Sequence, residues 1–231
     1  MTPLATLKAA CLLAVTLALT SALAATKNEV DQAMSRDGLQ KISVKGLDLA
    51  YARPGASLAA YKRVRIEPVD VEFDKSWDPA KTGSRIKLSN DEREKIKAAV
   101  ARLVEEEFAK AVQKGGSYQI ASDAAPDVLR VKVSILNLYV NAPSAGPGAT
   151  AGRSRTYVSS AGKMTLLAEL SDSTSGQMLA RVADVREANA SGAGRMELAD
   201  RMMNEDAARN VAASWAQILR KALDKARSIG S

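Results

Sequence analysis

Two arginines, Arg153 and Arg155, are the side chains whose type and spacing best indicate binding chemistry. They end a run of small and turn-forming residues, 142–155, that is rich in glycine and proline. A loop of this length inside a compact domain is either functional or disordered. Two guanidinium groups at its base can bind an anion or a partner's carboxylate, although the same loop could be the solvated tip of a hairpin. We predict that Arg153 and Arg155 contact an anion or a partner.

Acidic residues form the other candidate group, at Glu67, Asp70, Glu72 and Asp74. They could supply acid–base chemistry, or they could line the solvated face of a strand and protect a sheet edge. The chain has no histidine, and its single cysteine is Cys11. Catalysis by imidazole and zinc sites of the usual type are therefore excluded. We predict a protein that is not an enzyme, with no catalytic residue, no cofactor and no metal.

The first 24 residues have the pattern of a secretory leader. Lys8 precedes an apolar run from Ala9 to Leu19, and Ala22-Leu23-Ala24 is a small-residue cleavage site. The apolar run is too short to span a bilayer as a helix. The residues around Cys11 do not form a lipobox, so we expect cleavage after Ala24 and export to the periplasm without lipidation. The body would then contain no thiol.

The charge of the chain restricts its partners. The formal net charge is +7, and removal of the leader takes away Lys8 and no acid, which leaves +6. A basic exported protein is attracted to anionic envelope polymers and lipid surfaces. The bases alternate with acids, however, and only 4% of residues are aromatic, so a nucleic-acid partner is not expected.

Hydrophobic periodicity predicts one α+β domain over residues 49–228, preceded by a flexible segment, 25–48. Pro68 interrupts the first strand, which indicates a bulge or an edge strand. Ser89 and Glu92 form a capping box at the start of the first long helix, and Gly115 follows its end. The expected strands are 61–73, 118–120, 127–140, 163–170 and 177–186, and the expected helices are 90–114 and 204–226.

Each long helix has one apolar stripe, and both stripes need the same sheet to cover them. In the second helix the expected buried residues are Val211, Trp215, Ile218, Leu219, Ala222 and Ala226. The predicted fold is a two-layer α+β sandwich, in which two long helices cover one face of a mainly antiparallel or mixed sheet of four to five strands.

Three segments resemble a known family: Tyr51–Leu58, Tyr61–Asp70 with its Pro-Val-Asp motif, and the helix capped by Ser89. They are similar to the bacterial domain-of-unknown-function family numbered 3313, over about residues 49–225. That resemblance implies an envelope protein without an assigned activity, from a family of mostly lipoproteins. More distantly, the chain resembles the periplasmic modules of the TolB amino-terminal and curli-secretion type, which implies an assembly role.

The favoured functional hypothesis is an exported, non-catalytic interaction or assembly module with a protein partner in the envelope. It would act through an exposed strand edge and the loop 142–155. The alternatives are a binder of anionic envelope polymer or lipid, and a hydrolase that uses carboxylates. The sequence does not indicate an oligomeric state.

Overall fold

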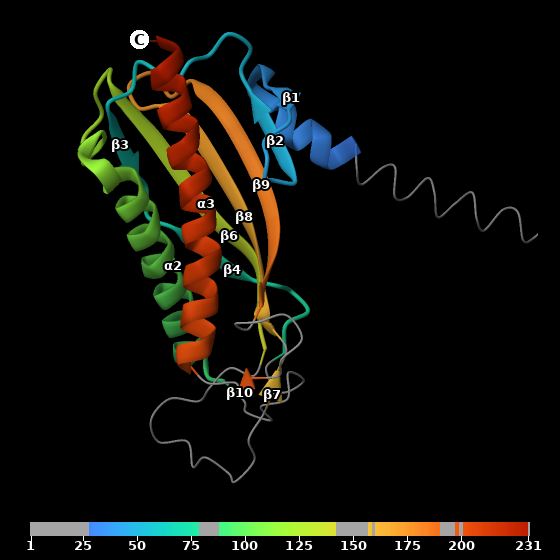
Figure 1. The fold of residues 1–231 in the computed structure, drawn as a ribbon. Helices are drawn as coiled ribbons and strands as arrows, with labels where there is room; N and C mark the ends of the chain where they lie inside the picture. The colour runs from blue at the N-terminus through green and yellow to red at the C-terminus, as the bar shows by residue number, and fades with distance from the viewer. Residues whose placement is uncertain are drawn as a thin grey trace, which may run out of the picture.

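The computed structural model describes residues 28–78, 88–141, 157–158, 160–189, 197–198 and 201–230. It forms a two-layer α+β sandwich, in which two long helices lie side by side on one face of a mixed sheet (Figure 1). The helices are α2, Asn90–Gln113, and α3, Arg201–Gly230. The predicted fold class is confirmed. No helix in the described ranges is long and apolar enough to cross a membrane.

The main sheet has eight strands in place of the four to five expected. Along the path of the sheet the order is β1-β2-β9-β8-β6-β3-β5, and β4 pairs with β6 beside β3. The strands are β1 Gln40–Ile42, β2 Leu49–Ala52, β3 Arg63–Ile66, β4 Asp70–Phe73, β5 Gln119–Ile120, β6 Val128–Val140, β8 Ser160–Asp172 and β9 Met178–Asn189. Two further strands, β7 Tyr157–Val158 and β10 Glu197–Leu198, pair with each other.

Local sequence signals explain α2. The Ser89 side chain accepts from the backbone N–H of Glu92, and the Glu92 carboxylate accepts in return from the backbone N–H of Ser89. These hydrogen bonds hold the pKa of Glu92 below its usual range. At the other end Gly115 has φ 78°, a conformation that glycine adopts without steric cost.

Pro68 divides the first predicted strand into two, β3 and β4, and both run parallel to β6. The expectation of an edge strand is wrong for β3, because β3 lies between β6 and β5. Proline has no N–H for a ladder. The chain therefore leaves the ladder at Pro68, and the N–H of Val69 donates to the Glu105 carboxylate of α2 (2.9 Å).

The amino-terminal segment corrects a second prediction. Residues 25–48 were expected to be flexible, but 28–35 form a helix, Arg36–Gly38 a 3-10 turn and Gln40–Ile42 the strand β1. Met34 and Leu39 are buried. The segment looks weakly structured in sequence because it places only these two large side chains against the sheet.

The core lies between the sheet and the two helices, as predicted. Val131, Val133 and Ile135 of β6 are fully buried, and so is Leu223 of α3. Within the predicted stripe of α3, Val211, Trp215 and Leu219 are buried, but Ala222 is exposed. The helical period places Leu223, one residue later, on the buried side.

Candidate interaction site on the second face of the sheet

The residues predicted to bind, Arg153 and Arg155, lie outside the described residues, and so does the cleavage site after Ala24. The candidate site is therefore built from the described part of the chain. Groups of three or more potential metal-ligating side chains are absent from the residues that the structure describes.

The sheet has a second face, opposite the helices, where side chains alternate with those of the core. Register partners share a face. Lys132 of β6, Glu169 of β8 and Arg181 of β9 therefore form one charged row across three strands. Arg65 and Arg130 are partners in the next row. The buried core residues Val131 and Val133 point the other way.

Ion pairs occupy much of this face. The Arg63 Nε atom donates to Asp127 (3.0 Å), and this contact holds the pKa of Asp127 below its usual range. Arg65 and Arg130 both contact Glu67, at 2.8 and 3.0 Å. Two arginines thus share one carboxylate, which leaves a local excess of positive charge.

The four predicted carboxylates do not converge. Glu67 binds Arg65 and Arg130, whereas Asp74 accepts from the N–H and hydroxyl of Ser76. The Ser76 hydrogen bonds hold the pKa of Asp74 below its usual range. Asp70 and Glu72 are exposed on β4.

Beside the charged row lie two rows with apolar side chains. Leu167, Ala183 and Leu49 are register partners across β8, β9 and β2, and Leu136, Thr165 and Val185 form the row below them. We call Leu49, Leu136, Leu167, Ala183 and Val185 the apolar patch. Val185 is 58% exposed, more than the other exposed large hydrophobic residues that the structure describes.

Part of the second face is covered by residues 28–38, which we call the strap. Met34 and Leu39 form a small cluster with Tyr51, and Leu49, Leu167, Met178 and Ala183 pack against that cluster. Figure 1 shows this segment apart from the two-helix layer, next to β1 and β2. The second face therefore has its own small hydrophobic cluster, separate from the main core.

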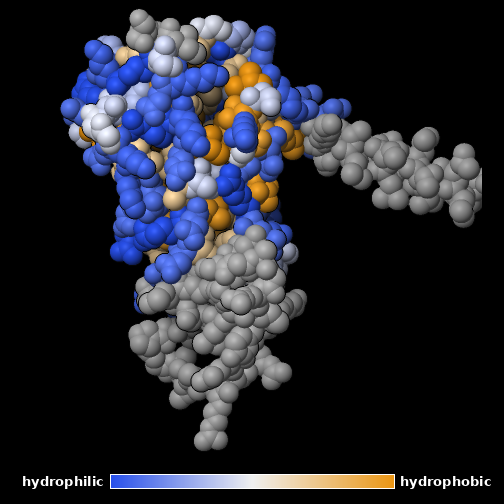
Figure 2. Space-filling view, in the orientation of Figure 1, coloured by the Kyte–Doolittle hydropathy of each residue, from blue (hydrophilic) through white to orange (hydrophobic). Residues whose placement is uncertain are grey.

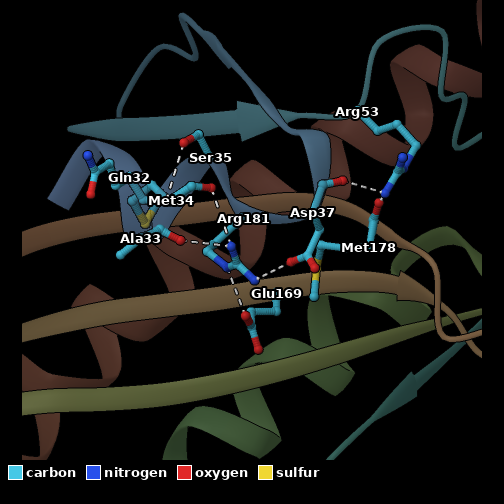
Figure 3. Close-up of polar contacts among 9 residues, drawn as sticks. All are labelled: Gln32, Ala33, Met34, Ser35, Asp37, Arg53, Glu169, Met178 and Arg181. Carbon is cyan, nitrogen blue, oxygen red and sulfur yellow. Dashed lines mark hydrogen bonds and ion pairs between the residues drawn. The ribbon is translucent and has the colours of Figure 1, made fainter. Parts of the chain in front are cut away.

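Arg181 is the polar centre of this cluster (Figure 3). Its side chain is 11% exposed and pairs with Glu169 at 2.8 Å and with Asp37 at 3.0 Å. Its Nη1 atom donates to the backbone oxygens of Ala33 (3.0 Å) and Met34 (3.4 Å), at the end of the strap helix. A buried guanidinium is stable only when its donors are used in this way.

Two further residues hold the strap. Arg53 donates to the backbone oxygen of Asp37 (2.7 Å) and to that of Met178 (2.7 Å). The Tyr51 hydroxyl donates to the Asp31 carboxylate, and Lys41 contacts the same carboxylate at 3.2 Å. Burial of Tyr51, together with the hydrogen bond to Asp31, raises the pKa of Tyr51.

On the helix side, buried charges bind each other. Asp184 accepts from the Trp215 indole N–H (2.6 Å) and from Arg186 (2.7 Å), and it also accepts from the backbone N–H of Asp48 (3.0 Å). Glu107 of α2 accepts from Arg209 of α3 (2.8 Å). These groups join elements to one another and face the interior. Figure 2 shows that the helix side is largely hydrophilic, with apolar side chains beside α3 over the β9–β2 part of the sheet.

Sequence reasoning did not identify Arg181. The alternation of β9 was a usable signal, because Arg181 and Glu187 interrupt a hydrophobic strand at even spacing and mark its second face. The partners Ala33, Met34 and Asp37 lie more than 140 residues away in the chain. Their pairing could not be derived from spacing.

Solved structures with related topology are only distantly similar. The PelC dodecamer from Paraburkholderia phytofirmans has 13% identity and a TM-score of 0.36, over 73% of this chain and 96% of that chain. Protein XCC0632 from Xanthomonas campestris, of family DUF330, has 11% identity and a TM-score of 0.42, over 73% and 86%. A candidate lipoprotein from Caulobacter crescentus CB15 has 12% identity and a TM-score of 0.35, over 75% and 94%. At these scores no property of those proteins is transferred to this chain.

Sequence comparison is more informative. No curated protein matches this chain significantly. The profile of the family described as "Protein of unknown function (DUF3313)" matches residues 28–219. The match begins at the first residue of the strap helix and covers the main sheet, α2 and most of α3, so it includes both faces described above. The chain is a member of the DUF3313 family.

Proposed function

We propose that this protein is an exported, non-catalytic interaction module of the cell envelope, which binds a partner protein through the second face of its sheet. The observation that carries the proposal is the apolar patch beside the row Lys132–Glu169–Arg181. Exposed apolar surface next to charged side chains is typical of protein–protein contacts. Val185 lies in the patch and is 58% exposed.

The export part of the proposal is supported by the leader sequence alone. Its test is the mass of the protein recovered from the periplasmic fraction. We expect a mature amino terminus at Ala25. An unprocessed chain in the cytosol would contradict this part, whatever the second face binds.

The binding part is tested by photo-crosslinking in intact cells. A benzoylphenylalanine at position 185 places the crosslinker in the apolar patch, and the same group at Gln217 places it on the exposed side of α3. We expect a discrete crosslinked protein from position 185 and none from position 217. Equal products from both positions, or none from 185, would reject the second face as the binding surface.

A second candidate function is binding to an anionic envelope polymer or lipid. It is favoured by the shared carboxylate of Arg65 and Arg130 and by the exposed Lys132 on the same face. Cosedimentation with lipopolysaccharide or peptidoglycan would then weaken as salt rises. Replacing Arg130 and Lys132 by Gln would weaken it further, and replacing Arg153 and Arg155 by Ala tests the loop. Salt-independent binding would remove this candidate.

A further inference from the structure

The strap is joined to the domain by few buried contacts. Among residues 28–38, Met34 is the one buried side chain, and it is 5% exposed. Val30, one helical turn earlier, is 47% exposed. A segment with so little buried apolar surface opens at a lower free energy than the domain core.

The end of the strap is a natural hinge. Asp37 has φ 67° and Gly38 has φ 76°, so two consecutive residues adopt left-handed conformations. An aspartate is held there only where its surroundings define the position. Here Arg181 binds the carboxylate of Asp37 and Arg53 binds its backbone oxygen. Loss of these contacts would free the helix 28–35 and leave β1 in the sheet.

The chemistry of the contacts defines what the site beneath the strap accepts. The hydrogen bonds named above run from donors of the domain, on Lys41, Tyr51, Arg53 and Arg181, to oxygens of the strap. The strap carries Glu29, Asp31 and Asp37 against a single base, Arg36. The site is therefore basic and apolar, and its occupant is acidic with one apolar anchor.

We propose that the strap is a detachable intramolecular occupant of a peptide-binding site. When it leaves, the site takes an acidic helical segment of a partner protein that carries an apolar anchor. The site comprises Leu49, Tyr51, Arg53, Leu167, Met178, Arg181 and Ala183. It is continuous with the apolar patch, since Leu49, Leu167 and Ala183 belong to both, so release of the strap enlarges the exposed apolar surface. The identity of the occupant rests on the proposed function, whereas detachment of the strap does not.

The test uses the full chain and a synthetic peptide of its own residues 28–38. Met34→Asp removes the anchor of the strap and leaves every residue of the site unchanged. Val30→Asp adds the same charge to the same helix at an exposed position and is the matched control. We expect the labelled peptide to bind Met34→Asp at least tenfold more tightly than it binds the wild type or Val30→Asp. Adding Arg181→Met to Met34→Asp should reverse that gain.

Hydrogen exchange measures detachment in the wild type, without any variant or partner. The amides of 28–35 should exchange at least tenfold faster than those of β8. Asp37→Asn should accelerate them about tenfold further, whereas Arg130→Met, an arginine of the same face that pairs with Glu67, should not. Strap amides that exchange only with the whole domain would overturn the proposal.

The remaining outcomes are also decisive. If Met34→Asp fails to fold, Asp37→Asn replaces it in the peptide assay. A folded variant with an open strap and no peptide binding would overturn the peptide-binding site. A stable dimer between Met34→Asp and the wild type would assign the site to a second copy and overturn the partner segment. Failure of crosslinking at Val185 alone would reject the proposed function and leave detachment of the strap standing.

Discussion

At the scale of single residues, the second face and the core use buried polar side chains as connectors. Tyr61 is a clear example, because its hydroxyl donates to the Asp172 carboxylate (3.1 Å). Burial and this hydrogen bond raise the pKa of Tyr61 to about 12. The backbone N–H of Ser175 donates to the same carboxylate (2.7 Å), and it contributes most to holding the pKa of Asp172 below its usual range. The pair connects the start of β3 with the turn between β8 and β9.

Tyr61 should therefore make stability fall in alkali. The unfolded tyrosine loses its proton near pH 10 and the folded one near pH 12, so the folded state binds more protons in between and stability falls as pH rises. We expect a loss of about 1 kcal/mol between pH 9 and pH 11 from this residue. Urea unfolding at both pH values measures it, and Tyr61→Phe should show a smaller loss. An equal loss in both proteins would show that Tyr61 is not the source.

At the scale of elements, the far end of the sheet depends on a close approach between β6 and β8. The register of β6 shifts between Leu136 and Tyr139, and Asn137 has φ 51°. Opposite this bulge, Gly162 pairs with Val140 and has φ 146°. A Cβ atom at Gly162 would lie 1.9 Å from the backbone oxygen of Tyr139, so only glycine fits without a shift of the backbone.

Gly162→Ala should be costly for that reason. Gly176→Ala is the control, because Gly176 also has positive φ (72°) but no atom within 4 Å of the added Cβ. The control should lose about 1 kcal/mol from backbone strain. Gly162→Ala should lose a further ~1–3 kcal/mol from the clash. Chemical denaturation of both variants gives the comparison, and equal losses would mean that β6 and β8 can move apart freely.

At the scale of the whole molecule, one sheet carries two hydrophobic clusters of unequal size. The larger one lies under α2 and α3 and contains Phe108 and Trp215, each 2% exposed. The smaller one lies under the strap. The domain should therefore depend on the first cluster for its stability, while the second cluster can open locally.

Replacing Phe108 or Trp215 by Ala should lower the free energy of unfolding by about 3–5 kcal/mol, because each leaves a large cavity. Trp215 also donates its indole N–H to the buried Asp184. Ala222→Gln, on the same helix as Trp215 but exposed, should change stability by less than about 0.5 kcal/mol. Thermal and urea unfolding measure all three, and a small loss for Phe108→Ala would contradict the assigned core.

The sequence by itself determined the features that depend on neighbouring residues. The capping box of α2, the stripes that identify both long helices, and the β8–β9 hairpin with its turn at 172–176 are all local in the chain. The paired helix stripes also imply a common sheet, which gave the fold class. Only tertiary structure decided that β3 and β4 run parallel to β6, that Arg181 binds the strap, and that the strap lies on the second face. Each of these depends on contacts between distant segments, whose register is set by packing and hydrogen bonding that no local pattern encodes.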